Sequence, residues 1–252
     1  MAGHVEKTDY SKIAERYDKV RSPPSDDIVS KIIDFGKILD WCSVLDVGCG
    51  TGRYPLSINN QKNCVTCALD PSAEMLRSAT QKDESNDVMW VRGDGQYLPF
   101  RRETFDCVYM TMVIQHINDK KKAIHDIHSV LRSGGRFVIF TGSHARLRKQ
   151  ALSDFRGVVE IDMKRFPTIP YLRKTMRDAG YSDIHHYPIE CNKYQQIDEF
   201  LEKVRSKYVS TLTLLSDDVF QRRYKVFEAK VRRKYNSQVL VFTGNDFVVG
   251  EK

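Results

Sequence analysis

The sequence contains no apolar run long enough to cross a bilayer, because its longest apolar stretches have only the length of a strand. Residues 1–19 are charged and polar and include no apolar segment of the kind that a secretory signal needs. No segment is of low complexity, and no internal repeat is visible. These absences exclude a membrane span and predict a cytoplasmic globular protein.

Metal-binding patterns are also scarce. Six cysteines are scattered along the chain, and the single CxxC spacing, Cys64 to Cys67, has no second CxxC and no paired histidines nearby. The two cysteines lie in a run that reads as a strand, which favours two small core residues with reduced thiols. We therefore predict no metal site.

Charge is unevenly distributed. The chain has 40 Lys and Arg against 33 Asp and Glu, a net charge of +7, and from residue 145 onward 21 basic residues face 14 acidic ones. The first 144 residues are therefore balanced, at 19 of each. The basic second half could attract anionic substrates or nucleic acid, or it could be an ordinary solvated helical face.

Strands and helices alternate through the first part of the chain. Helical spacing covers residues 9–20 and 25–35, and Gly134-Gly135 is expected to stop a helix over residues 119–131. Such alternation predicts right-handed βαβ units and a parallel sheet covered on both faces. The expected strands are 43–47, 64–69, 88–92, 105–113 and 136–141, with a further helix at 72–79.

The pattern loosens after residue 145. We expect a helix at 171–179, a strand at 184–189 and one or two amphipathic helices within 197–235. The runs 238–242 and 247–249, separated by Gly244-Asn245, could form a hairpin or one kinked strand. The aromatic face of the 197–235 helices could pack on a core, roof an acceptor pocket, or do both. Its members are Phe200, Tyr208, Phe220, Tyr224 and Phe227.

The most informative segment ends the first strand. Asp46 is followed by Gly48, Gly50 and Gly52, which suits a sharp turn whose main chain a ligand can touch. The GxGxG spacing differs from the GxGxxG of dinucleotide sites, and Asp46 favours a ligand with a positive amino group. Asp70, at the end of the second strand, is placed to accept hydrogen bonds from a ribose diol.

Two later segments fall at the same predicted edge of the sheet. Asp94 and Gly95 follow the third strand, where a carboxylate could accept a hydrogen bond from an adenine amino group. Gln115 and His116 follow the fourth strand, on the side where open α/β sheets bind ligands.

Together these motifs resemble class I S-adenosylmethionine-dependent methyltransferases, most closely the branch similar to ubiquinone and menaquinone biosynthesis enzymes. The resemblance covers about residues 40–142, and residues 10–21 resemble the helix that precedes the core in that branch. The motifs that carry it are Asp46-Val-Gly-Cys-Gly-Thr-Gly52, Leu69-Asp70-Pro-Ser-Ala-Glu-Met75, Gly93-Asp94-Gly-Gln-Tyr-Leu-Pro-Phe100, Phe105-Asp-Cys-Val and Val130-Leu-Arg-Ser-Gly-Gly-Arg136.

The resemblance implies a Rossmann-like α/β fold. Its sheet would have seven mostly parallel strands with an antiparallel last strand, helices on both faces and a small helical cap. It divides the chain into N-terminal helices covering the cofactor site (1–40), a core (41–196 with 237–252) and a cap inserted before the last strand (197–236).

The resemblance also implies how S-adenosylmethionine, and its product S-adenosylhomocysteine, would be held. Asp46 and the turn would take the methionine end, Asp70 the ribose, and Asp94 with Gly95 the adenine. The turn residues are Gly48, Cys49, Gly50 and Gly52; Pro71 and Met75 would pack nearby, and Tyr17 and Arg21 would close over the cofactor.

Methyl transfer from a sulfonium needs in-line placement of a nucleophile more than activation of the methyl group. His116 is the best candidate for a general base, with His144 second, and Gln115 could orient the acceptor. His116 could equally pack or cap a helix. We expect a small-molecule acceptor and a monomer or homodimer. The alternatives are a tRNA or protein methyltransferase that docks through the basic half, and a non-catalytic cofactor-binding module.

Overall fold

The computed structural model describes residues 24–252, so the predicted helix at 9–20, with Tyr17 and Arg21, lies outside the described residues. The chain divides into two compact units, which we describe separately. The sheet unit comprises residues 24–141, 169–187 and 247–252, and the helical unit comprises 142–168 and 188–246. The predicted cap at 197–236 is thus one part of the helical unit, and its covering role stays a prediction.

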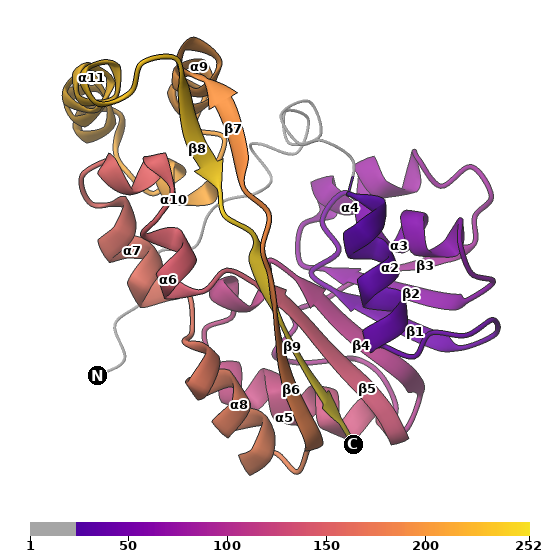
Figure 1. Ribbon diagram of the computed structural model, residues 1–252. Coiled ribbons are helices and arrows are strands. Elements are labelled where there is room, and N and C mark those ends of the chain that lie inside the picture. The colour runs from indigo at the N-terminus through magenta and orange to yellow at the C-terminus, as the bar shows by residue number, and fades with distance from the viewer. Residues whose placement is uncertain (1–23) are drawn as a thin grey trace. The chain divides into compact units, whose positions relative to one another are not determined.

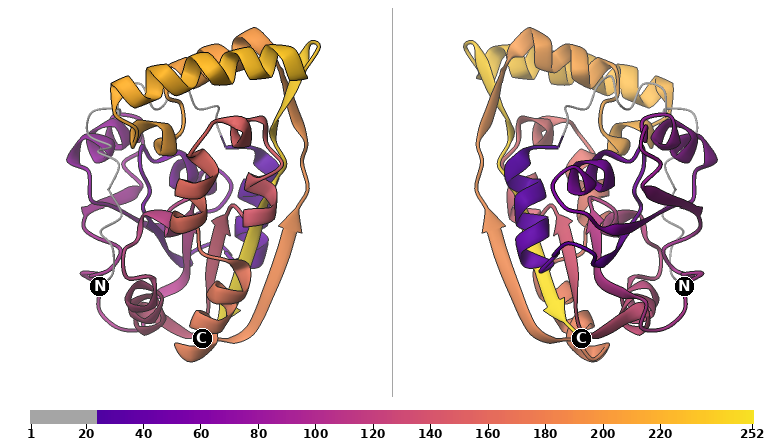
Figure 2. Two further views of the ribbon diagram at one scale, coloured as in Figure 1. Left: turned by 90° about the vertical axis from the view of Figure 1, so that its left-hand side faces the viewer. Right: turned by 90° about the vertical axis from the view of Figure 1, so that its right-hand side faces the viewer.

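A seven-stranded sheet forms the centre of the sheet unit, in the order β3-β2-β1-β4-β5-β9-β6 (Figure 1). Strand β1 pairs in parallel with β2 and β4, whereas β9 runs opposite to β6 (Figure 2). The Gly134 amide donates to the Lys252 carbonyl at 2.8 Å, which joins the start of β5 to the end of the antiparallel β9. The predicted fold class is confirmed. The strands are β1 (Ser43–Val47), β2 (Val65–Asp70), β3 (Val88–Arg92), β4 (Phe105–Thr111), β5 (Leu131–Thr141), β6 (Ser182–Ile189) and β9 (Asn245–Glu251).

Helices cover both faces of this sheet because successive strand residues point to opposite sides. Leu45 and Val47 pack in one buried cluster with side chains of α5 (Lys120–Val130) and α8 (Ile169–Asp178). On the other face, Ala68 packs with side chains of α3 (Arg53–Asn59) and α4 (Ala73–Thr80). The third helix of that face is α2 (Asp26–Phe35), whose last ring lies edge-on to Phe247 with the ring centroids 5.1 Å apart.

One predicted boundary is wrong. The helix expected over 119–131 ends at Val130, and residues 131–135 belong to β5 instead of a loop before a strand at 136–141. Gly134-Gly135 does not stop the helix; it lies within the strand, where Gly134 has φ +77° and its amide bonds to Lys252. Strand β5 begins at Leu131 because this residue pairs with Phe105 of β4, and Gly134 further along the strand bonds to the end of the chain.

The helical unit has its own hydrophobic core. The ring of Phe155, the residue after η3, meets two rings of α11 there, with ring centroids 5.1 Å from Phe227 and 5.7 Å from Phe220. Phe200, Phe220, Tyr224 and Phe227 are all buried in this cluster, so the packing interpretation of the aromatic face is confirmed for these four. The elements are α6 (His144–Leu147), η3 (Ala151–Asp154), α7 (Val158–Arg165), β7 (Lys193–Gln196), α9 (Ile197–Arg205), α10 (Ser210–Thr213), α11 (Asp217–Lys234) and β8 (Gln238–Phe242).

The last two β runs do not form a hairpin with each other. Strand β8 pairs antiparallel with β7 in a two-stranded sheet, whereas β9 joins the seven-stranded one (Figure 1). The chain bends between them at Gly244, which has φ +90°, and a Cβ there would lie 1.8 Å from the Ile189 carbonyl oxygen. Only glycine fits this bend. Among residues 24–252, no helix is long and apolar enough to cross a membrane.

Candidate functional site

The turn after β1 is built from three glycines in the left-handed region. Gly48, Gly50 and Gly52 have φ values of +81°, +56° and +78°, which explains why glycine recurs at alternate positions. Two backbone bonds fix the start of the turn, since the amides of Gly48 and Cys49 both donate to the Leu69 carbonyl, at 2.7 and 3.1 Å. Gly52 is the N-cap of α3, so the turn leads directly into a helix.

The three glycines differ in what surrounds them. A Cβ at Gly48 would lie 2.5 Å from the Val113 side chain, and one at Gly52 would lie 2.6 Å from Trp90. At Gly50 a Cβ would meet nothing within 4 Å among the described residues. Gly48 and Gly52 are therefore required by packing, whereas Gly50 leaves open space above the turn that a ligand can occupy.

Asp70 connects this turn to the end of β2. Its Oδ2 accepts the Gly50 amide at 2.8 Å and its Oδ1 accepts the Ser72 amide at 2.9 Å. Burial raises the pKa of Asp70, and these two hydrogen bonds offset part of that rise. Each oxygen keeps a second lone pair, so the carboxylate can fix the turn and still accept hydrogen bonds from a diol.

Asp46 is fully buried beside Tyr109, its register partner on β4. Neither carboxylate oxygen of Asp46 nor the Tyr109 hydroxyl makes a hydrogen bond of acceptable geometry to any described residue. Burial raises the pKa of Asp46 well above its ordinary value; the nearby Tyr109 hydroxyl lowers it in part, and Asp70 raises it further. Buried polar groups are normally satisfied, so this pair is short of a donor or cation.

The loop after β3 approaches the same edge. A Cβ at Gly95 would lie 2.8 Å from the Val47 side chain and 3.2 Å from Ile117. Asp94 accepts the Gln96 amide at 3.0 Å, and Gln96 in turn accepts the Asp119 amide at 2.7 Å. Asp94 therefore stabilises its own loop, and the loop lies close to the end of β1.

The segment after β4 completes the edge, because Val113 packs against Gly48. Met112 has φ +56°, an uncommon conformation for a residue other than glycine and one that is enriched at functional sites. Gln115 is buried; its amide donates to the Met112 carbonyl at 2.6 Å, and its Oε1 has no partner in the described chain. His116 is partly exposed at the end of the short helix η2 (Ile114–His116).

The remaining predicted residues occupy different settings. Cys49 is buried in the turn, and burial together with Asp46 and Asp70 raises the pKa of its thiol well above the ordinary value, which keeps the thiol protonated. Met75 is buried in α4, whereas Pro71 is exposed. His144 lies in the helical unit, where its Nε2 is 2.8 Å from the Phe166 carbonyl oxygen, a contact that anchors the ring locally.

Two polar groups at this edge went unnoticed in the sequence. Tyr109 lies beside Asp46, and Thr141, the last residue of β5, has a buried hydroxyl without a partner among the described residues. Both lie in apolar runs that predict an ordinary buried strand and no functional role. The strand order β1-β4-β5 is needed to place Tyr109 beside Asp46, and to place Thr141 two strands away at the same edge of the sheet.

The geometry suits a ligand with a cationic group and a diol. Asp46 supplies two unsatisfied buried acceptors, Asp70 keeps free lone pairs, and Gly50 leaves space for the ligand against the main chain. S-adenosylmethionine has both chemical groups, so the residues present fit it. Within residues 24–252 no cluster of three or more histidine, cysteine or acidic side chains could hold a metal ion.

Comparison with known proteins agrees with the motifs. Residues 45–139 match the model of a methyltransferase domain family. The demethylmenaquinone methyltransferase of Lactiplantibacillus plantarum is 31% identical over 134 residues, which cover 46% of this chain and 56% of that enzyme. The match thus extends over little more than half of that relative's length.

Solved structures show the same fold. A putative methyltransferase from an antibiotic biosynthesis pathway of Anabaena variabilis superposes with a TM-score of 0.76 at 19% identity, covering 91% of this chain and 98% of its own. Phosphoethanolamine N-methyltransferase 2 of Haemonchus contortus, solved with S-adenosyl-L-methionine, superposes with a TM-score of 0.66 at 18% identity, covering 99% of this chain and 60% of its own. The resemblance to class I methyltransferases is therefore confirmed.

Proposed function

We propose that this chain, whose residues 45–139 match a methyltransferase domain family, transfers a methyl group from S-adenosylmethionine to a small-molecule acceptor. The observation that carries the proposal is Gly50. It combines a left-handed backbone, open space above its Cα and an amide held by Asp70. The main chain at Gly50 is therefore held rigidly, and no described residue packs into the space above its Cα.

Each anchor has a distinct role in this proposal. Asp46 accepts hydrogen bonds from the amino group of the cofactor, which supplies the donors that its two oxygens otherwise lack. Asp70 accepts from the ribose hydroxyls while it holds Gly50 in place. Asp94 and Gly95 receive the adenine, with the Asp94 loop braced by Gln96. The anchors come from loops after β1, β2 and β3, so they fix the cofactor at three separate points.

The cofactor supplies an electrophilic methyl group on a sulfonium whose leaving group is a neutral thioether. The protein then has to orient the acceptor in line and exclude water. Gln115 holds an unsatisfied Oε1 near the end of β4, which suits orientation of an acceptor hydroxyl or amine. His116 is its neighbour and serves as general base where the acceptor carries a proton.

A small-molecule acceptor is favoured by the relatives. The Lactiplantibacillus relative is named for demethylmenaquinone, and the Haemonchus neighbour is named for phosphoethanolamine. These acceptors differ widely in chemistry, as is usual where one fold hosts many functions. We therefore propose the class of the acceptor and not its identity.

Calorimetric titration with S-adenosylhomocysteine, with NAD+ as a competing nucleotide, tests the cofactor. We expect saturable binding of S-adenosylhomocysteine and none of NAD+, because the turn has the GxGxG spacing. Preference for NAD+ would contradict the proposal. Incubation with methyl-labelled cofactor and a panel of quinols, amines and acids then tests transfer by mass spectrometry. Binding without any methylated product would favour the non-catalytic module.

A further inference from the structure

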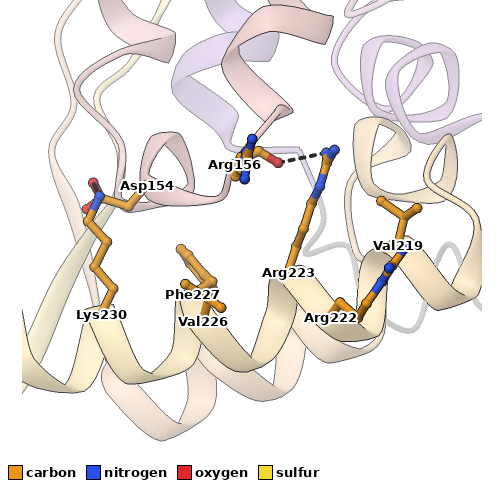
Figure 3. Close-up of a pocket in the computed structure, with 8 residues that line it drawn as sticks. All are labelled: Asp154, Arg156, Val219, Arg222, Arg223, Val226, Phe227 and Lys230. Carbon is orange, nitrogen blue, oxygen red and sulfur yellow. Dashed lines mark hydrogen bonds and ion pairs between the residues drawn. The ribbon is translucent and has the colours of Figure 1, made fainter.

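A pocket of about 350 Å³ opens on the helical unit, and none of the residues assigned to the cofactor site lines it. One stripe of α11 forms most of it, because Val219, Arg222, Arg223, Val226, Phe227 and Lys230 recur at helical spacing (Figure 3). Asp154 and Arg156, from η3 and the residues after it, supply the opposite wall. The volume is in the range of small-molecule sites.

The lining is basic, and its one carboxylate is already neutralised. Asp154 accepts Lys230 at 2.8 Å and Lys234 at 2.7 Å. Burial alone would raise the pKa of Asp154, but these two ammonium groups bring it below its ordinary value, so the carboxylate stays ionised and paired. It has little capacity left to attract the arginines of the pocket.

Three guanidinium groups remain without a carboxylate partner among residues 24–252. Arg223 donates to the Arg156 carbonyl at 3.0 Å, and Arg222 donates to the Asp218 carbonyl at 3.3 Å. The side chain of Arg156 has no described partner. Figure 3 shows Arg223 reaching from α11 toward Arg156, which brings two of the three cations to one side of the pocket.

The floor of the pocket is apolar. Val226 is 71% exposed in spite of its hydrophobic side chain, and Val219 is partly exposed beside it. These two valines give the pocket a small apolar surface beside its arginines. The lining of the pocket therefore suits a ligand that has an anionic group and a small apolar part.

We propose that this pocket binds an organic phosphate monoester. A phosphate monoester presents three terminal oxygens, which matches three guanidinium groups, whereas a carboxylate presents only two. Arginine is well suited to this geometry because its planar fork donates two parallel hydrogen bonds. The organic part of the ligand would lie on Val219 and Val226.

Nucleic acid fits the pocket less well. A strand of RNA needs a basic track with exposed aromatic rings on which bases stack. The only aromatic residue of the lining, Phe227, is 1% exposed because it belongs to the core of the helical unit. The cations also gather in one concave site, which suits a single compact anion.

Calorimetric titration of the full chain with phenyl phosphate tests the proposal. We expect saturable binding that weakens at least about 10-fold in the double variant Arg156→Gln/Arg222→Gln, because both charge-assisted contacts are lost. Neither guanidinium bonds to another side chain in the described structure, so this variant should fold normally. The double variant Lys225→Gln/Arg233→Gln is the matched control, since it also removes two positive charges, both from positions of α11 outside the pocket, and should change binding by less than about 2-fold.

The charge of the ligand gives a second measurement. The second ionisation of a phosphate monoester lies near pH 6, so binding of phenyl phosphate should strengthen between pH 5 and pH 8. Phenyl sulfate stays a monoanion over this range and should bind weakly with no such rise. Equal binding of the two ligands at pH 8 would overturn the proposal.

Further ligands identify the source of the phosphate. Binding of free phenyl phosphate, or of vesicles that contain phosphatidic acid, supports the proposal and separates a soluble metabolite from a lipid headgroup. Failure to bind either, or preference for a short single-stranded RNA that is lost in the same double variant, overturns it. S-adenosylhomocysteine binding should be unchanged in all these variants, so this test is independent of the proposed methyltransferase function.

Discussion

The carboxyl edge of the sheet and the α11 pocket hold opposite charges in opposite settings. At the sheet edge, Asp46 is buried and lacks a partner, and its pKa is raised by burial. In the α11 pocket, Arg156 and Arg222 are exposed, and the one acid, Asp154, is fully paired. The first site is built by backbone geometry and the second by side-chain spacing along a helix.

This difference predicts how each site responds to change. A buried site fixed by main chain should be sensitive to one added carbon atom and insensitive to salt. An exposed site made of long side chains should tolerate small changes in shape and respond to ionic strength. Each of the following experiments compares the two sites, or compares one site with a matched position elsewhere.

The largest effect is expected for Gly50→Ala. Its methyl group would project into the open space of the proposed cofactor site, so S-adenosylhomocysteine should bind at least about 100-fold more weakly, the effect of a clash costing about 3 kcal/mol. Gly134→Ala is an unusually close control, because Gly134 also has a positive φ and a Cβ there would also meet nothing within 4 Å in the described chain. Both variants should lose about 1 kcal/mol of stability, but only Gly50→Ala should lose the ligand. Equal binding by the two variants would remove Gly50 from the site.

A smaller effect is expected on the free energy of unfolding in Asp46→Asn and Asp154→Asn. The two substitutions should change it in opposite directions. The pKa of Asp46 is raised in the folded chain, so its carboxylate costs stability as the pH rises above about 4, the unfolded value. Asp46→Asn should therefore be more stable than the wild type at pH 7, by about 1–3 kcal/mol, and similar to it at pH 4.

Asp154 provides the contrast. Its pKa is lowered in the folded chain, so it stabilises the fold above about pH 4, and this contribution disappears as the pH falls through the folded pKa. Asp154→Asn should be less stable than the wild type at pH 7, by about 1 kcal/mol, and this difference should shrink as the pH falls below about 4. Urea unfolding across this pH range measures both variants. A destabilised Asp46→Asn at pH 7 would mean that Asp46 serves the fold and not a ligand.

The features that the sequence predicted well are local ones. Strands β1 and β3 begin and end at the predicted residues because short apolar runs bounded by turn residues define them. The glycine turn was predictable because only glycine adopts its backbone angles freely. The position of Asp70 beside this turn was predictable because neighbouring parallel strands end at the same edge of the sheet, whereas its role toward a ribose stays a prediction.

The features that it missed depend on distant residues. The start of β5 depends on the pairing of Leu131 with Phe105 of β4, and Tyr109 reaches Asp46 only through the strand order. The α11 pocket could not be predicted from the sequence for the same reason. Its stripe has the spacing of any amphipathic helix, and Arg156 joins it from a separate loop. Nothing local distinguishes an arginine that lines a pocket from one on a solvated face.

Salt should produce the smallest and most discriminating effect. Raising the ionic strength from about 0.05 to 0.5 M shortens the screening length from more than 10 Å to about 4 Å, which weakens attraction between exposed charges. Phenyl phosphate should therefore bind several-fold more weakly, because Arg156 and Arg222 are exposed. S-adenosylhomocysteine should change by less than about 2-fold, because its anchors Asp46 and Asp70 are buried and little affected by screening. The two titrations can be run on one preparation. A large salt effect on S-adenosylhomocysteine together with none on phenyl phosphate would reverse the contrast, and would show that the basic site, not the acidic one, is the site shielded from solvent.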